Sequence, residues 1–181
     1  MNPIENFRST STVMEGLLDR VAQDEFALST PCADWSVEDL VDHIVNNIYF
    51  FAGAAGVAKA DAGVSIAADN AAGEYRIAVD LLLNAYADQL DTDLATPFGT
   101  FPGSMVLSVA FADQLTHVWD LSRALKVGVQ VDDDLVAQAE AAWQAFIQPE
   151  ARDGAMFVEA KTAPADASNL DRLAAFTGRT V

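Results

Sequence analysis

The chain has 181 residues, 51% hydrophobic and 20% charged, and this ordinary globular composition predicts a single domain over residues 1–181 with little disorder. Its 27 acidic residues outnumber its 10 basic ones, and a formal net charge of -17 excludes nucleic acid and anionic membrane surfaces as expected partners. Because no apolar run approaches the ~20 residues that cross a bilayer and no signal peptide is recognisable, we predict a cytoplasmic protein.

The N-terminal third of the sequence predicts two amphipathic helices. The first covers residues 3–24, where apolar side chains recur at helical spacing. The loop after it contains Cys32, the one cysteine, which we expect to be a small, buried and inert side chain. The second helix, over about residues 36–53, begins with a serine suited to its N-cap. His43 lies on the flank of its apolar stripe, and Asn47 follows one turn later on the same side.

A third helix is predicted over residues 71–90, before a segment that breaks helical periodicity. Its side chains Ile77, Leu81 and Leu82 are expected to face the core. Proline and glycine then recur through residues 91–103, which we interpret as a connection without a regular element.

The fourth predicted helix, over residues 104–125 with Gly128 as its C-cap, carries the most informative residues. Apolar residues surround most of it, so the helix is expected to be buried nearly all round. Asp113, His117 and Asp120 nevertheless share one face, because steps of three and four residues stack side chains on a helix. Buried charges of this kind need partners, since an unpaired one is costly.

Two shorter helices are predicted toward the C-terminus, over residues 132–147 and 168–177. Four long helices followed by two short ones make the expected fold class all-α, a four-helix bundle with additional short C-terminal helices.

The only two histidines of the chain, His43 and His117, suggest a metal site between the second and fourth helices. Asp113 and His117 lie four residues apart, so a carboxylate oxygen and an imidazole nitrogen can converge on one ion. The other interpretation is that these groups only hydrogen-bond to one another and to adjacent helices, with Asp39 orienting His43. The residues alone leave both interpretations open.

Three blocks of the sequence resemble the mycothiol-linked branch of the DinB-like metal-binding proteins. They are TPCADWSVEDLVDHIVNN at 30–47, DQLTHVWDLSRALKVG at 113–128 and ADASNLDRLAAFTGR at 165–179. The resemblance implies a four-helix bundle of the DinB type, with a maleylpyruvate-isomerase-like N-terminal domain. It also implies that His43, Asp113 and His117 bind a divalent metal, with Asp120 in the motif position after the histidine. Together with Asn47, which lies one turn after His43, Asp120 is an expected cofactor-binding residue.

In that family the metal holds and activates the thiol of mycothiol, and one member isomerises maleylpyruvate. The resemblance therefore implies a thiol-dependent transferase or isomerase, with mycothiol as cosubstrate and an electrophile of unknown identity as substrate. Zinc is the expected metal, although nickel, iron and manganese also suit two histidines and a carboxylate. A non-catalytic metal- or small-ligand-binding module and a purely structural bundle are the alternatives, and a homodimer is a candidate assembly.

Overall fold

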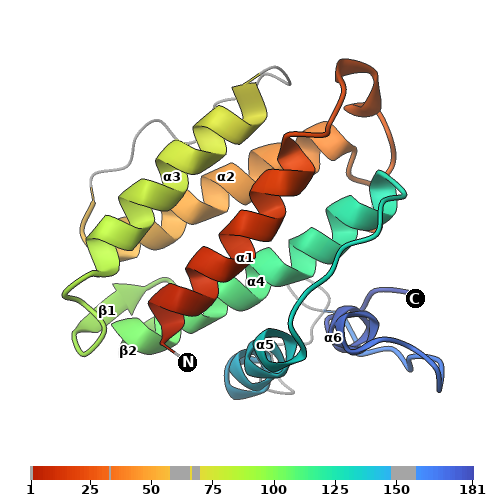
Figure 1. Cartoon of the computed structure of the whole chain (residues 1–181). Helices are drawn as coiled ribbons and strands as arrows, with labels where there is room; N and C mark the ends of the chain where they lie inside the picture. Colours follow the sequence, from red (N-terminus) through yellow and green to blue (C-terminus); the bar gives the residue numbers. More distant parts are fainter. Residues whose placement is uncertain (1, 33, 58–65, 67–69, 148–157) are drawn as a thin grey trace.

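Four long helices form the body of the protein, and they run alongside one another in Figure 1. The computed structural model describes residues 2–32, 34–57, 66, 70–147 and 158–181. The long helices are α1 (Pro3–Leu18), α2 (Val37–Ala54), α3 (Ala71–Tyr86) and α4 (Gly103–Ala124). Two shorter helices, α5 (Asp133–Phe146) and α6 (Asn169–Phe176), lie on the other side of α4. The predicted all-α, four-helix-bundle class is confirmed.

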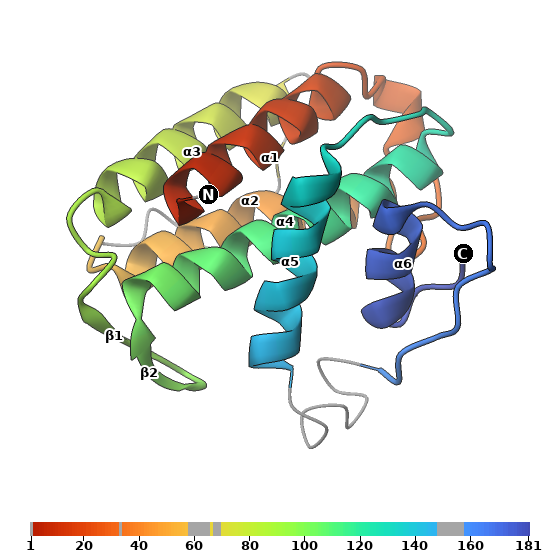
Figure 2. The ribbon, with the colours of Figure 1, turned by 60° about the horizontal axis from the view of Figure 1, so that its bottom comes forward.

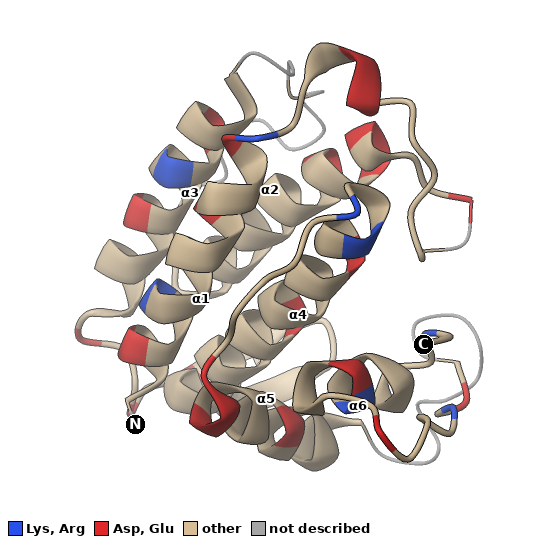
Figure 3. Ribbon diagram, turned by 45° about the vertical axis from the view of Figure 1, so that its right-hand side comes forward, with Lys and Arg blue, Asp and Glu red and all other residues tan. Residues whose placement is uncertain are grey.

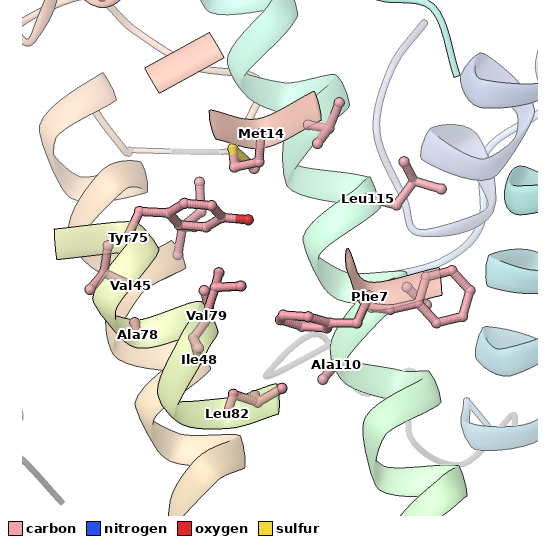
Figure 4. Packing of buried hydrophobic residues seen from close by; sticks show 14 of the residues in the cluster. Phe7, Met14, Val45, Ile48, Tyr75, Ala78, Val79, Leu82, Ala110 and Leu115 are labelled. Carbon is pink, nitrogen blue, oxygen red and sulfur yellow. The ribbon is translucent and has the colours of Figure 1, made fainter. Parts of the chain in front are cut away.

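The core lies between the four long helices, because each contributes an apolar stripe to it. Helix α1 packs against α4 and α3, while α2 packs against α3 and α4. Figure 4 shows side chains from these helices meeting in the interior, among them Phe7, Met14, Tyr75, Leu82 and Leu115. Helix α4 is buried on nearly every side, as predicted, because α5 and α6 cover the part that α1 and α2 leave exposed.

Helix α2 begins where the sequence predicts, and its first turn explains why. Ser36 accepts a hydrogen bond from the Asp39 backbone N–H at 3.2 Å, and Asp39 Oδ2 accepts one from the Ser36 backbone N–H at 2.8 Å. This capping box satisfies donors that a helix N-terminus otherwise leaves unpaired. Asp39 is thereby engaged at the cap, so it does not orient His43 as the alternative interpretation supposed.

The structure corrects three details of the predicted elements. Helix α1 ends at Leu18, and a short 3-10 turn η1 (Gln23–Glu25) replaces the predicted last turns. Ile77 is 59% exposed, because the buried stripe of α3 passes through Tyr75 and Val79 instead. Helix α4 ends at Ala124. The left-handed residue that follows it is Lys126, with φ of 55°, and not the predicted Gly128. The sequence also predicts a helix stop at Pro149 and a frayed helix end followed by a loop over residues 53–72, but Pro149 and most of 53–72 lie outside the described residues.

The segment 91–103 contains a β-hairpin where the sequence predicted only a connection. Strand β1 (Asp93–Thr96) pairs antiparallel with β2 (Gly99–Pro102). Thr96 closes the turn, since its hydroxyl donates to the Gly99 carbonyl at 2.9 Å and accepts from the Phe98 N–H at 3.2 Å. Such short strands leave little periodicity to detect. The hairpin places Phe98 at its tip, beside the first turns of α4.

Gly103 joins the hairpin to α4, and its lack of a side chain is required there. A Cβ at this position would overlap the backbone carbonyl of Gln89. We therefore expect Gly103→Ala to lower the free energy of unfolding by about 1–3 kcal/mol, as overpacking does elsewhere. Gly128→Ala is the matched control, because nothing lies within 4 Å of the added methyl group. Thermal unfolding measures both variants, and equal midpoints would contradict this account of Gly103.

Acidic residues are spread along the helices, with few basic ones among them (Figure 3). Of the described acidic residues only Asp120 is buried, so the net charge of -17 is carried mainly by groups in contact with water. No helix within the described ranges combines the length and the low polarity needed to span a bilayer.

Candidate metal centre

A cavity of about 870 Å³ lies beside α4, between α2, the hairpin, α5 and the C-terminal segment. Figure 2 shows the hairpin beside the first turns of α4 and α6 beside its last turns, so the cavity runs along this helix. Its size is typical of a site for a small organic ligand. His43, Asn47, Asp113 and His117 all line it, as does Cys32.

The two histidines approach each other from facing helices. Their ring centroids are 4.8 Å apart, and Trp35 lies against His43 with a centroid distance of 4.7 Å. Burial and the neighbouring His117 charge lower the pKa of His43 to about 4. His43 is therefore neutral near pH 7, which leaves it a nitrogen lone pair for a ligand.

Asp113 is fixed between α2 and its own helix. Asn47 Nδ2 donates to Asp113 Oδ2 at 2.6 Å, which directs the other carboxylate oxygen toward His117. Asp113 Oδ1 and His117 Nε2 are 3.6 Å apart, too far for a hydrogen bond but close enough to share one cation. The predicted neighbour Asn47 thus orients a carboxylate at the centre of the cavity.

Asp120 lies behind His117, fully buried, and holds the other side of its ring. His117 Nδ1 is 2.9 Å from Asp120 Oδ2, so Nδ1 carries the proton and Nε2 is left facing Asp113. A carboxylate behind a histidine is the usual arrangement at metal sites, because it fixes the tautomer and raises the basicity of the ligand. Although burial opposes it, the negative charge of Asp113 with the Asp120 hydrogen bond raises the pKa of His117 to about 10.

Arg179 neutralises Asp120 from the C-terminal segment. Its Nη2 donates to Asp120 Oδ2 at 2.8 Å and its Nε donates to Oδ1 at 3.2 Å, a paired geometry that suits guanidinium and carboxylate. Burial raises the pKa of Asp120, but the His117 and Arg179 contacts outweigh it and hold the pKa below its usual range. The cluster is therefore an ion pair buried behind the histidine.

Two groups of three potential ligands occur among the described residues, and they share His117. His43, Asp113 and His117 offer atoms that all lie within 4.8 Å of one another, and so do Cys32, His117 and Asp120. The second group already surrounds the positive charge of Arg179, which occupies the place of a cation. The first group contains no arginine or lysine, and a metal that displaced the proton from His117 Nε2 would meet two imidazole nitrogens and one carboxylate, the donor set of many catalytic zinc sites. These residues fit a divalent metal.

Sequence reasoning was wrong about Cys32 and overlooked Arg179. Cys32 is half-buried in the cavity wall, where its thiol donates to Asp120 Oδ2 at 3.2 Å, so it is not an isolated core residue. Arg179 and Asp120 are 59 positions apart, and no local pattern joins them. The available signal was the third block of family resemblance, which ends at this arginine.

Comparison with known sequences identifies relatives over the whole length. The sequence model of the family described as "Mycothiol maleylpyruvate isomerase N-terminal domain" matches residues 7–110, a range that contains His43 and ends before Asp113. Two uncharacterized proteins of Mycobacterium tuberculosis, from strains CDC 1551 and H37Rv, are each 30% identical over 185 residues. Each alignment covers 100% of both chains.

Solved structures share the fold. The mycothiol-dependent maleylpyruvate isomerase has a TM-score of 0.62 at 15% identity, over 79% of this chain and 67% of that one. A DinB-like protein from Bacillus cereus ATCC 10987 has a TM-score of 0.58 at 19% identity, over 72% of this chain and 95% of that one. Both structures share the helical-bundle fold of this chain.

Proposed function

Because this chain belongs to the mycothiol maleylpyruvate isomerase N-terminal domain family, we propose that it binds a divalent metal and uses a small thiol such as mycothiol as cosubstrate. Family membership agrees with the resemblance of the three sequence blocks. The observation that carries the metal proposal is the convergence of His43, Asp113 and His117 in one cavity. We further propose that residues 1–181 act as one domain in the cytoplasm.

In this proposal His43, Asp113 and His117 hold the metal, with zinc as the leading candidate. A bound divalent ion would favour the thiolate over the thiol of a cosubstrate at neutral pH. The residues around the metal site position the candidate ligands and fix their protonation. Asn47 orients Asp113, and Asp120 with Arg179 holds His117 in the tautomer whose Nε2 faces the cavity.

The other residues that line the cavity bear on whether the protein is a transferase or isomerase or a binding module without catalysis. Apart from the candidate ligands and Cys32, the titratable groups among its described lining residues are Lys161 and Arg179. Lys161 Nζ donates to Thr180 at 2.6 Å, and Arg179 is paired with Asp120. Because each of these two groups already has a hydrogen-bond partner, we infer that the chemistry is performed by the thiolate itself. The same observation supports the alternative, a metal- or small-ligand-binding module without turnover.

Proton release on thiol binding tests the proposal. Titrating mycothiol into zinc-loaded protein is expected to release about one proton per site, because a coordinating thiol is deprotonated. Calorimetry in buffers that differ in ionisation enthalpy counts these protons. Cys32→Ser should release the same number, which excludes Cys32 as their source. A protein that retains zinc while thiols release no proton would be a metal-binding module instead.

A further inference from the structure

The cavity extends well beyond the candidate metal ligands, toward the N-terminal end of α4. Met105, Val106 and Val109 line it there, ahead of Asp113 on the same helix. With a rise of 1.5 Å per residue, Val106 lies about 10 Å from Asp113 along the helix axis. The cavity therefore has a second compartment that neither a metal ion nor a thiol sulfur occupies.

Aromatic rings enclose this second compartment. Phe98 at the hairpin tip lies 6.5 Å from Phe50 of α2 and 6.0 Å from Phe146 of α5, as measured between ring centroids. Phe101 and Trp143 contact Phe146 at 6.2 Å and 6.3 Å. Three elements distant in sequence thus converge as one aromatic wall, and none of these five side chains is ionisable at neutral pH.

The opposite end of the cavity has a different character. There the C-terminal segment contributes the polar or basic residues Lys161, Thr177, Arg179 and Thr180 beside one apolar side chain, Val158. The candidate metal ligands lie between the two ends, since Asp113 and His117 follow the apolar turns of α4 and precede Asp120. A polar thiol with several hydroxyl or carboxylate groups matches this end, because the Lys161 ammonium group has three donors and spends one on Thr180, whereas Arg179 is already paired with Asp120.

From this asymmetry we propose that the aromatic compartment binds the second substrate, and that this substrate is a small, uncharged electrophile with an aromatic or otherwise apolar body. The proposal rests on the thiol-dependent function proposed above. Apolar walls with few polar groups are the usual lining of sites for such ligands, whereas a dicarboxylate would leave its charges unpaired beside phenyl rings.

The chemistry requires nothing beyond the two substrates and water. If the thiolate adds to an activated double bond of the acceptor, one carbon–sulfur bond forms and the electron pair of the double bond moves to the neighbouring carbon. That carbon then takes one proton from water, so the reaction needs no oxidant or reductant.

Phe98 offers the sharpest test, because 49% of it is exposed and its removal should not disturb the core. A neutral fluorescent dye, N-phenylnaphthylamine, is titrated into metal-free protein, so that neither metal nor thiol affects the result. We expect the dye to bind the wild type, and Phe98→Ala to weaken binding about 3- to 10-fold through loss of aromatic contacts. Ile77→Ala is the matched control, since it removes another exposed apolar side chain, 59% exposed and outside the cavity, and should not change dye binding.

Competition identifies the ligand class. Neutral naphthalene should displace the dye, whereas the dicarboxylate maleate should not at equal concentration. Absence of dye binding, equal affinities for Phe98→Ala and Ile77→Ala, or displacement by maleate would each overturn the apolar assignment. These results are independent of the proton-release experiment. If the dye binds but thiols release no protons, the proposed thiol-dependent function is wrong and the aromatic binding site stands. If thiols release protons but the dye does not bind, only the inference about the aromatic compartment is wrong.

Discussion

Replacing His117 with alanine is expected to lower the affinity of the protein for Zn²⁺ by more than about 100-fold, because loss of a direct ligand exceeds the effect of losing an outer hydrogen-bond partner. His117 is 4% exposed and belongs to both groups of potential ligands, so its replacement removes a ligand from each of them. Competition with a chromophoric chelator measures the affinity, using protein purified without a histidine tag. Elemental analysis of the same sample identifies the metal.

Two further variants distinguish a residue that binds the metal directly from residues that only contact a ligand. Cys32→Ser should leave the affinity nearly unchanged, because its thiol contacts Asp120 and Arg179 rather than the proposed ion. Asp120→Asn should weaken binding by about 10- to 100-fold, as expected of a residue that orients a ligand. Equal losses in His117→Ala and Cys32→Ser would make Cys32 a ligand. A larger loss in Asp120→Asn than in His117→Ala would give that role to Asp120.

The second large effect is on stability. Arg179→Ala is expected to lower the free energy of unfolding of the metal-free protein by about 3–5 kcal/mol, because it removes the paired guanidinium from the buried carboxylate of Asp120, which then keeps only His117 and Cys32 as partners. Asp120 has no exposed surface, and the side chain of Arg179 is 18% exposed. Urea denaturation measures the change, and chelator in the buffer keeps bound metal from masking it.

Arg76→Ala is the control for this variant, since it also removes an arginine paired with carboxylates. The partners of Arg76 are Glu15 and Asp19, and all three side chains are well exposed to solvent. Exposed ion pairs contribute little to stability because water screens them. A loss in Arg76→Ala as large as that in Arg179→Ala would mean that burial of the Asp120 pair has no special energetic role.

Helical periodicity in the sequence predicted most of the helices, and it predicted that His43, Asp113 and His117 would lie close together. The step of four residues from Asp113 to His117 fixes their shared face whatever the neighbours are. His43 could be placed opposite them because its own helix carries a continuous apolar stripe, which must face the core. These arguments use only local geometry and burial, so they survive without knowledge of the tertiary structure.

The remaining errors concern features that depend on tertiary contacts, namely which side of a helix is buried and which distant residues contact each other. Ile77 was placed in the core because every third or fourth residue of α3 is apolar, and only packing against α1 and α2 selects the stripe through Tyr75. Arg179 pairs with Asp120 and Phe98 with Phe146 across long stretches of chain, and such pairs leave no spacing pattern. The aromatic wall was therefore invisible in the sequence, although each of its residues is plainly hydrophobic.

The position of Trp35 gives the site an optical signal of its own. Its indole is half-buried with its ring centroid 4.7 Å from that of His43 and 6.3 Å from that of His117, whereas Trp119 and Trp143 are each 3% exposed. A cation held by the two imidazoles changes the electric field at this indole, and indole emission responds to nearby charge. A variant that retains only Trp35 would therefore report occupancy of the centre by its intrinsic fluorescence, in real time and without a bound dye.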